Sequence, residues 1–413
     1  MAARIKPVRR DGPRETKPSS DGMMKVLTVF GTRPEAIKMA PVVHQLRRTP
    51  DISSFVCVTA QHRQMLDQVL EAFDIEPDYD LDIMTPRQSL TQITTKVLEG
   101  LEKVLDAVRP DLVLVHGDTT TSFAAALAAF YRRVAVGHVE AGLRTYDKGA
   151  PYPEEMNRQL VGVLADLHFA PTDWAADNLR RERKPSERIW VTGNTVIDAL
   201  RTTVRSDYRH PVLEATAGKK MILMTAHRRE NLGEPLWHIC RAVLRLVDTH
   251  PDIAVVYPVH LNPAVQETVR QVLGDHPRVH LLEPLDVIDF HNFEARAHLI
   301  LSDSGGVQEE APAFGVPVLV LREKTERPEG LAAGTLRLVG TDEETVFQEA
   351  HRLLVDDREY QKMAQAANPY GDGLAARRIV QAILYHYGHA VQPPEPFSPT
   401  AGTEPPVHTR SIL

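Results

Sequence analysis

The chain has 413 residues, of which 43% are hydrophobic and 25% charged, and its net charge is -7. This length favours two domains, and the composition is that of a globular protein. The negative charge argues against a general nucleic-acid binder, and no apolar run approaches the roughly 18 residues of a membrane span. Cys57 and Cys240 lie in or near apolar runs without metal-ligand spacing, which indicates core positions in a reducing cytoplasm.

Both ends of the chain have the composition of disordered segments. Residues 1–22 are rich in Arg, Lys, Pro and Ser with almost nothing apolar, and residues 391–413 are dense in Pro. Such segments bury too little apolar surface to offset the conformational entropy that is lost on ordering. We therefore expect a disordered extension at the start of the chain and a disordered tail at its end.

Between these ends, short Val/Ile/Leu-rich runs alternate with longer amphipathic runs. Near-continuous apolar strands are typical of a parallel sheet with helices on both faces. Two βαβ series in tandem predict an α/β protein with two doubly wound, Rossmann-like domains facing a cleft, residues 23–195 and 196–370, and a helix over 371–390 that packs back on the first domain. The predicted strands are 24–30, 54–60, 111–116, 134–139, 166–170, 188–192, 221–226, 253–259, 279–283, 299–303, 316–321 and 335–339.

The first strand, 24–30, leads directly into the segment GTRPE (31–35) and then into a helical pattern. The glycine permits a sharp turn, and Pro34 suits the first helical position. Arg33, with Lys38 one turn later, would lie beside a helix N-terminus at the carboxyl end of a strand, where open α/β sheets bind ligands and anions. The residues alone leave open an ordinary strand–helix turn with solvated charges.

Acidic residues follow the later strands of the first domain. Asp118 and Glu140 each come soon after a predicted strand, and Glu154 lies in the first turn of the next helix. Carboxyl groups that lie close together push one another's pKa values apart, which lets an acid and a base coexist. Asp118 could instead be a helix N-cap, and the helix dipole would stabilise Glu154 without a catalytic role.

The second domain supplies basic residues and a glycine-rich turn. His227 follows the first strand of this domain, and Ser304–Gly306 opens a helix after a later strand. Backbone N–H groups and glycines at a helix N-terminus suit a diphosphate, and Glu310 could reach a ribose diol. A glycine-rich helix start without a ligand is the alternative. It is weakened because His227 and Arg327 should border the same crevice.

A series of motifs, in order along the chain, resembles the non-hydrolysing UDP-N-acetylglucosamine 2-epimerases of bacteria. The resemblance spans about residues 24–388 and implies the two-domain GT-B fold. It also implies interconversion of UDP-N-acetylglucosamine and UDP-N-acetylmannosamine for cell-envelope polysaccharides, without a metal or nicotinamide cofactor, by a homodimer. The motifs are GTRPE 31–35, HGDT 116–119, HVEAGLRT 138–145, PEEMNR 153–158, HRREN 227–231, SDSGGVQEE 302–310 and TERPE 325–329.

The resemblance also implies residue roles at the matching positions. Many bacterial members bind a second UDP-N-acetylglucosamine as an activator beside the active site. The acidic catalytic residues match Asp118, Glu140 and Glu154, and the leaving-group histidine matches His227. The nucleotide contacts match Arg33, Lys38, Ser304, Gly305, Gly306, Glu310 and Arg327. The activator site matches Gln61, His62, Gln64, Arg87, Glu154, Arg228 and His260.

The expected mechanism follows from the bond to be inverted. The C2–H of the sugar is not flanked by a carbonyl, so simple deprotonation would be far too slow. Loss of UDP with the C2 proton would give 2-acetamidoglucal, and UDP would re-add with protonation from the other face. We expect Asp118 and Glu140 to transfer the protons, His227 to assist the phosphate and Glu154 to couple the two sites. Which carboxylate is the base for which epimer stays open.

Other functions also remain open at this stage. A hydrolysing epimerase would release free N-acetylmannosamine and UDP. A GT-B glycosyltransferase would need an acceptor, and a catalytically silent UDP-sugar sensor would bind its ligand without turnover. The intact Asp118, Glu140 and His227 argue against the sensor.

Overall fold

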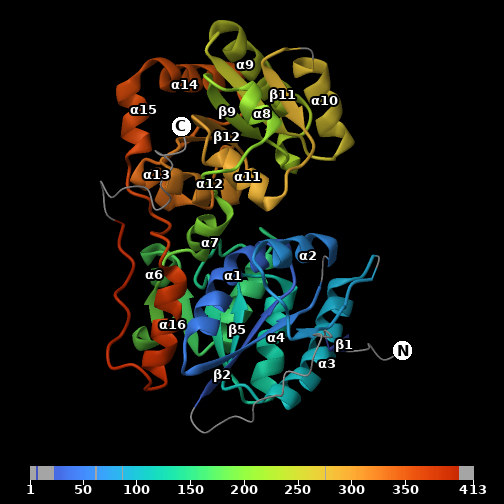
Figure 1. The fold of residues 1–413 in the computed structure, drawn as a ribbon, viewed down its shortest axis with the longest axis vertical. Coiled ribbons are helices and arrows are strands. Elements are labelled where there is room, and N and C mark those ends of the chain that lie inside the picture. Colours follow the sequence, from blue (N-terminus) through green and yellow to red (C-terminus); the bar gives the residue numbers. More distant parts are fainter. Residues whose placement is uncertain (1–5, 8–22, 61–62, 86, 275, 400–413) are drawn as a thin grey trace. The chain divides into compact units, whose positions relative to one another are not determined.

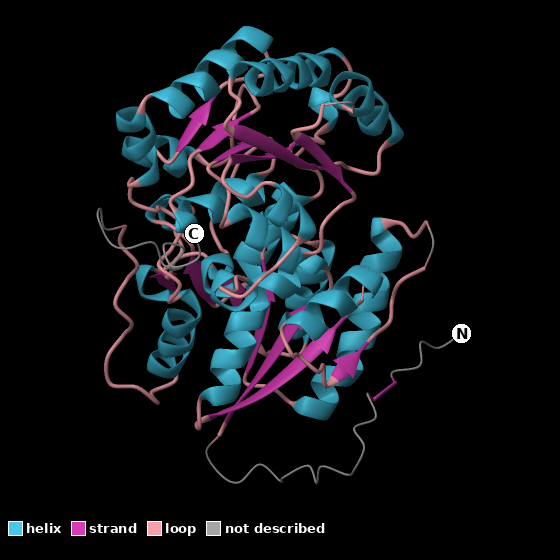
Figure 2. Ribbon diagram, turned by 45° about the horizontal axis from the view of Figure 1, so that its top comes forward, coloured by secondary structure: helices cyan, strands magenta, loops and turns pink. Residues whose placement is uncertain are grey.

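The computed structural model describes residues 6–7, 23–60, 63–85, 87–274 and 276–399 (Figure 1). The chain divides into two compact units, which are described separately below. Unit 1 comprises the chain up to Ala199 together with Gly373–Phe397, and unit 2 is built from Leu200–Asp372. Each unit contains one sheet with helices packed against it, and Figure 2 shows the strands in magenta.

Among the described residues, unit 1 has an eight-stranded sheet in the order β1-β4-β3-β2-β5-β6-β7-β8. All neighbouring strands are parallel except β1 and β4. Every residue of β5 is buried, as expected for an inner strand that is covered on both faces. The strands are β1 (Lys6–Pro7), β2 (Met24–Phe30), β3 (Ile52–Val58), β4 (Tyr79–Asp80), β5 (Leu112–His116), β6 (Ala135–Val139), β7 (Leu167–Ala170) and β8 (Ile189–Val191).

The helices of unit 1 start where the sequence supplies capping side chains. Ser89 caps α3 and Thr119 caps α4, each by accepting a backbone N–H of the first turn. Helix α16, near the end of the chain, packs against α1 and so belongs to this unit (Figure 1). The helices are α1 (Arg33–Arg48), α2 (Arg63–Ala72), α3 (Leu90–Val108), α4 (Thr120–Tyr131), α5 (Glu154–Leu164), α6 (Asp173–Arg181), the 3₁₀ turn η1 (Ser186–Arg188) and α16 (Ala375–His386).

Unit 2 has, within the described residues, a six-stranded parallel sheet in the order β11-β10-β9-β12-β13-β14. Its core is formed by the apolar faces of β9, β10, α9 and α14. The strands are β9 (Lys220–Thr225), β10 (Ile253–Pro258), β11 (Val279–Leu282), β12 (Leu299–Ser302), β13 (Val318–Val320) and β14 (Leu336–Leu338).

Helix α7 (Thr195–Thr203) carries the chain from unit 1 into unit 2. The helices of unit 2 are α8 (Pro211–Ala215), η2 (Arg229–Asn231), α9 (Glu234–Thr249), α10 (Pro263–Leu273), α11 (Val287–Glu294), α12 (Gly305–Glu310), η3 (Ala311–Phe314), α13 (Pro328–Ala333), α14 (Glu343–Val355) and α15 (Asp357–Ala364).

The strand order of each sheet reverses beside the first long strand of the unit. In unit 1, β2 lies between β3 and β5, and in unit 2, β9 lies between β10 and β12. At such a reversal, the chain crosses to one side of the sheet after one strand and to the other side after its neighbour. The loops that follow these two adjacent strands therefore diverge and leave room for a ligand at the carboxyl edge of the sheet. The candidate residues after β2, β5, β9 and β12 all belong to these loops.

The predicted α/β class with two parallel sheets is confirmed. Each predicted strand has a counterpart whose ends differ by up to two residues. Strands β1 and β4 were not predicted, because a two-residue strand is too short to show a periodic pattern. The expected disorder of residues 1–22 falls almost entirely outside the described residues.

The chain after α16 differs from the expected free tail over 391–413. Residues up to 399 are described, and Phe397 is 4% exposed in an apolar cluster with β8 and α6. Its N–H donates to the carbonyl of Val191 at 2.9 Å, and the Arg378 guanidinium lies 5.7 Å from its ring centroid. One aromatic side chain is enough to attach this Pro-rich segment to unit 1. Residues 400–413 lie outside the described part.

Both cysteines occupy the expected core positions. Cys57 in β3 and Cys240 in α9 are free and buried. Burial raises the pKa of the Cys57 thiol, and it raises the pKa of Cys240 to about 12. Neither thiol is therefore a nucleophile at neutral pH.

Candidate functional site

One buried carboxylate fixes the turn after β2. Glu35, in the first turn of α1, accepts the backbone N–H groups of Gly31 at 3.0 Å and Thr32 at 2.8 Å. A Cβ on Gly31 would lie 2.0 Å from the Thr59 Oγ1, so no larger residue fits without a shift. These contacts hold Arg33, the first residue of α1, at the carboxyl end of β2.

Glu35 also joins this turn to the turn after β5. Its other oxygen accepts the hydroxyl of Thr119 at 2.6 Å and the hydroxyl of Ser122 at 2.9 Å. Sequence reasoning gave Glu35 no role of its own. The spacing Thr32-x-x-Glu35 is that of a capping box and could have identified it. Glu35 is therefore a positioning residue, because it links the turn after β2 to the turn after β5.

Glu140 follows β6 in the left-handed backbone region, with a φ of 62°. Its side chain is 11% exposed and forms an ion pair with Lys38. Nε2 of His116 lies 3.6 Å from the carboxylate, and Nδ2 of Asn194 lies 3.4 Å from it. Burial acts to raise the pKa of Glu140, but Lys38 and His116 hold this pKa well below its ordinary value. Glu140 is therefore an ionised carboxylate in a nearly dry site.

Asp118 lies two residues beyond the end of β5. The side chain of Thr119 caps α4, so the N-cap alternative for Asp118 is wrong. Asp118 instead forms an ion pair with Arg158 of α5 at 2.8 Å. Burial raises the pKa of Asp118, Arg158 opposes this rise, and the like charges of Glu140 and Glu154 add to it. The net result is a pKa above the ordinary value, opposite in direction to that of Glu140.

The two glutamates at the start of α5 have different environments. Glu155 is fully buried and accepts the backbone N–H groups of Thr145 and Tyr146, both at 3.0 Å. It therefore fixes the loop after β6. Glu154 is half-buried, and its charge acts on Asp118. The structure thus brings the three predicted acids Asp118, Glu140 and Glu154 into one cluster.

The other ligand contacts expected in unit 1 are only partly covered by the described residues. Lys38 was expected to contact the nucleotide, and its ammonium forms an ion pair with Glu140. Arg87 is exposed just before α3, with a φ of 56°. Gln61 and His62, expected at the activator site, lie outside the described residues, and Gln64 belongs to α2.

In unit 2, one carboxylate organises the loop after β9. Asp303, directly after β12, is fully buried. One of its oxygens accepts the N–H of His227, the N–H of Arg228 and the side-chain amide of Asn231, each at 2.9 Å. Sequence reasoning missed Asp303, although it lies within the motif SDSGG. A carboxylate directly before a glycine-rich turn was the available signal.

His227 is held beside Asp303 and stacks on His260. Its Nδ1 lies 3.6 Å from the second oxygen of Asp303, and the two imidazole centroids are 5.4 Å apart at 9°. Burial lowers the pKa of His227, Asp303 opposes this effect, and His260 and Arg228 lower the pKa further. His227 is therefore a neutral imidazole near pH 7, and two other predicted residues, Arg228 and His260, lie beside it.

The glycine-rich turn lies next to a predicted arginine. Ser304 is the N-cap of α12, and a Cβ on Gly305 would lie 3.4 Å from the Arg327 guanidinium. Nε of Arg327 donates to Glu309 at 2.6 Å, which fixes the arginine there. With Gly306 as the next residue, the turn offers backbone N–H groups beside a positive charge, which suits an anion.

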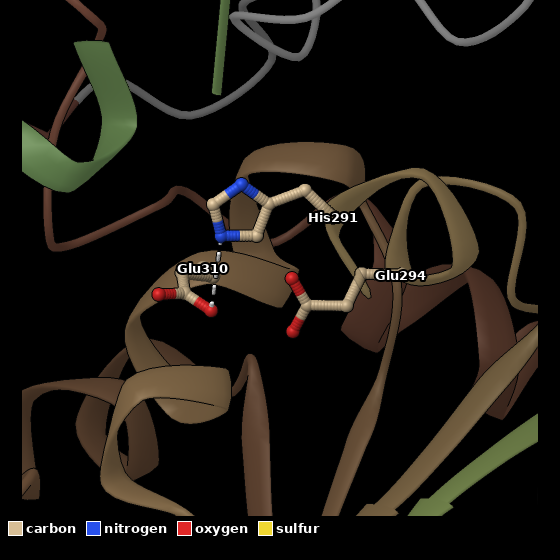
Figure 3. Close-up of side chains that lie close together, drawn as sticks. All are labelled: His291, Glu294 and Glu310. Atoms are coloured by element: carbon tan, nitrogen blue, oxygen red, sulfur yellow. Dashed lines mark ion pairs between the residues drawn. The ribbon is translucent and has the colours of Figure 1, made fainter. Parts of the chain in front are cut away.

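Glu310, expected near a ribose, ends α12 and borders the same turn. A Cβ on Gly306 would lie 3.5 Å from the Glu310 Oε1. On its other side Glu310 lies beside His291 and Glu294 (Figure 3). Neither of these two residues was singled out from the sequence.

Both units thus place charged side chains at the carboxyl ends of parallel strands, where the strand order reverses. This is the layout of α/β proteins that bind nucleotides. A cluster of acids in unit 1 and a glycine-rich turn beside an arginine in unit 2 are features typical of two-domain nucleotide-binding α/β proteins.

Comparison with known proteins identifies the family. The family profile described as UDP-N-acetylglucosamine 2-epimerase matches residues 44–384. The UDP-N-acetylglucosamine 2-epimerase of Bacillus subtilis is 62% identical over 375 residues, which cover 91% of this chain and 99% of that protein. The chain therefore belongs to the UDP-N-acetylglucosamine 2-epimerase family, and the resemblance seen in its motifs is confirmed.

Solved structures of relatives agree with this assignment. An S. aureus protein solved with UDP has a TM-score of 0.83 and 56% identity, over 91% of this chain and 100% of that chain. The Neisseria meningitidis UDP-GlcNAc 2-epimerase, solved with UDP-GlcNAc, has a TM-score of 0.80 and 50% identity, over 88% and 100%. The fold is that of these GT-B-like epimerases, as predicted. Within the described ranges, no helix is long and apolar enough to span a bilayer.

Proposed function

We propose that the protein epimerises UDP-N-acetylglucosamine reversibly at C2 to UDP-N-acetylmannosamine, without net hydrolysis, to supply cell-envelope polysaccharide precursors. The observation that carries this proposal is the acid pair Asp118 and Glu140. Their surroundings move the pKa of Glu140 down and the pKa of Asp118 up. Two carboxyl groups in one cluster, whose pKa values are displaced in opposite directions, are suited to remove a proton and to return one.

The reaction proceeds by elimination and re-addition, because no carbonyl makes the C2 proton acidic. A base takes the C2 proton, the C1–O bond breaks, and its electron pair leaves with UDP to give 2-acetamidoglucal. UDP then attacks C1 while an acid delivers a proton to C2 from the opposite face. Glu140 takes the base role for one epimer and Asp118 the acid role, and the roles reverse for the other epimer. Lys38 keeps Glu140 ionised between turnovers.

The departing diphosphate needs positive charge and hydrogen-bond donors. The turn Ser304–Gly306 and the adjacent Arg327 are suited to this task. His227 donates a hydrogen bond to the same phosphate, with its backbone fixed by Asp303. The relatives that were solved with UDP and with UDP-GlcNAc support a UDP-sugar as the ligand of this chain.

Product analysis separates the proposal from its alternatives. The protein is incubated with UDP-N-acetylglucosamine alone, and the products are resolved by chromatography. We expect UDP-N-acetylmannosamine to form while the total amount of nucleotide sugar stays constant. Stoichiometric free N-acetylmannosamine and UDP would mean a hydrolysing epimerase, and binding without any product would mean a sensor. Turnover that appears only with an added acceptor would mean a glycosyltransferase.

We also propose that UDP-N-acetylglucosamine activates the enzyme at a second site that includes Arg87, Arg228 and His260. A relative from Methanocaldococcus jannaschii was solved in complex with UDP-GlcNAc and UDP, which is compatible with a second ligand site. The rate should rise sigmoidally with UDP-N-acetylglucosamine, and Arg87→Ala should make the curve hyperbolic. Arg48→Ala, an exposed arginine on α1, is the matched control. Hyperbolic wild-type kinetics would remove the activator site and leave the epimerase assignment intact.

We further propose that the protein is a homodimer formed through the ends of α4 and α5. These helices are in contact, and each exposes apolar side chains near its C-terminus. The exposed residues are Phe130, Tyr131, Leu160 and Val163. Sedimentation should give a dimer for the wild type and a monomer for Val163→Glu. A wild-type monomer at micromolar concentration would refute the proposal.

A further inference from the structure

A histidine and two glutamates of unit 2 lie close together (Figure 3). His291 and Glu294 lie three residues apart on α11 and therefore share a helix face. Glu310 approaches from the end of α12. One ligand atom from each side chain lies within 4.8 Å of the other two. Two of the three residues are buried, and Glu310 is half-buried.

Glu294 lies against a second carboxyl group, that of Glu310, with which it can share a proton. Its side chain is fully buried, and within the described part of the chain neither oxygen has any other hydrogen-bond donor in ordinary geometry. Burial raises the pKa of Glu294 well above its ordinary value, and the like charge of Glu310 and a hydrogen bond to the Glu310 side chain add to this rise. A buried carboxylate beside a second carboxylate is strongly destabilising unless a proton or a cation neutralises it.

We propose that His291, Glu294 and Glu310 bind one divalent transition-metal cation of the Zn²⁺ class. An imidazole nitrogen and two carboxylate oxygens form a ligand set that suits Zn²⁺ and the related Co²⁺. Binding places a double positive charge between the two carboxyl groups, and a proton that they share would be released to solvent. Three protein ligands leave a coordination position open for water or for an oxygen of a ligand.

The histidine of this site is already oriented for coordination. Metal-bound histidines usually have their second ring nitrogen held by a hydrogen bond. Nδ1 of His291 lies 2.8 Å from the Thr203 hydroxyl, and Nε2 faces Glu310 at 3.9 Å. The adjacent Asn292 donates to the carbonyl of Thr203 at 2.8 Å and ties α11 to the same segment. These contacts preset the ring plane and reduce the ordering that metal binding would require.

A consequence for nucleotide binding rests on the proposed function. Glu310 is also the residue assigned to the UDP ribose. A cation that holds Glu310 would remove this contact, so metal and UDP should compete. The cation would then act as an inhibitor of the epimerase rather than as its cofactor.

Cobalt binding to the chelator-treated full-length protein tests the proposal directly. Titration with Co²⁺, without nucleotide, should produce saturable ligand-field absorption at one Co²⁺ per chain, and Zn²⁺ should displace it. Glu294→Gln and His291→Asn should each abolish the absorption. Thr203→Val should weaken Co²⁺ affinity roughly 10- to 100-fold. Glu283→Gln, an exposed glutamate of the same unit, is the matched control and should bind as the wild type does.

The Co²⁺ titration and the epimerase product assay can fail independently of one another. Circular dichroism confirms that each variant is folded, and Glu294→Gln alone suffices if His291→Asn does not fold. Absence of saturable wild-type absorption, or equal absorption in Glu294→Gln, would overturn the proposal and mean that the two glutamates share a proton. If Co²⁺ binds and UDP does not compete, the metal site stands and the ribose role of Glu310 fails. If Co²⁺ binds and no epimer forms, only the proposed function fails.

Discussion

Removing Lys38 tests how the Glu140 carboxylate is kept ionised. The two side chains are 14% and 11% exposed, so the ion pair is largely shielded from water. Removing one partner of a buried pair costs about 3–5 kcal/mol, because it leaves the other charge uncompensated. We expect about 3 kcal/mol for Lys38→Met. This is the low end of that range, because His116 and Asn194 remain beside the carboxylate.

The sign of the pH dependence should reverse in this variant. The lowered pKa of Glu140 in the wild type stabilises the fold above the unfolded pKa, and this stability is lost as pH falls through the folded pKa. Without Lys38, burial dominates and raises the pKa of Glu140 above its ordinary value. The variant should then lose stability as pH rises from 5 to 8, and the acidic limb of its rate profile should move upward.

Calorimetry and pH–rate profiles measure both effects. A loss of about 3 kcal/mol should lower the Tm of unit 1 by roughly 6–12 °C. The double variant Lys38→Met/Glu140→Gln should recover most of this loss, because both charges are then gone. Lys103→Met changes an exposed lysine on α3 and should have no effect. A Lys38→Met protein with the Tm and pH profile of Lys103→Met would refute the reasoning.

Further substitutions test the other parts of the structure. Asp118→Asn and Glu140→Gln should each lower turnover about 10²- to 10⁴-fold in steady-state assays, and a parallel loss of UDP affinity would contradict their assignment to proton transfer. Asp303→Asn removes the charge that fixes the loop after β9, so isothermal titration should show UDP binding weakened roughly 5- to 100-fold, and unchanged binding would show that the loop needs no such support. Phe397→Ala should destabilise unit 1 by about 3 kcal/mol in chemical denaturation, whereas an unaltered midpoint would mean that this segment contributes nothing to the fold.

The sequence predicted the sheets well because their strands are short apolar runs between amphipathic helices. The runs that became β2, β5 and β12 are buried on both faces and could hardly adopt another role. Asp118 and Glu140 were found because polar residues directly after buried strands lie at the ligand-binding edge of a parallel sheet. Their positions after β5 and β6 were therefore enough to predict that the two side chains lie near one another.

Residues that act through distant partners could not be predicted in the same way. Glu35 connects to Thr119 across the sheet, and Asp303 fixes a loop that precedes it by more than seventy residues. Glu294 has the sequence context of an ordinary helical glutamate, and its full burial is visible only in the folded structure. The attachment of Phe397 was hidden by the Pro-rich composition around it. Each depends on tertiary contacts that no local pattern encodes.

The central claim is that epimerisation breaks and re-forms the C2–H bond through an acid–base pair. The most direct measurement is NMR of UDP-N-acetylglucosamine that has been incubated with the protein in heavy water. A proton held on Glu140 or Asp118 exchanges with solvent before it returns. The account therefore predicts deuterium at C2 of both UDP-N-acetylglucosamine and UDP-N-acetylmannosamine. Formation of the second epimer with complete retention of the original C2 hydrogen would contradict it.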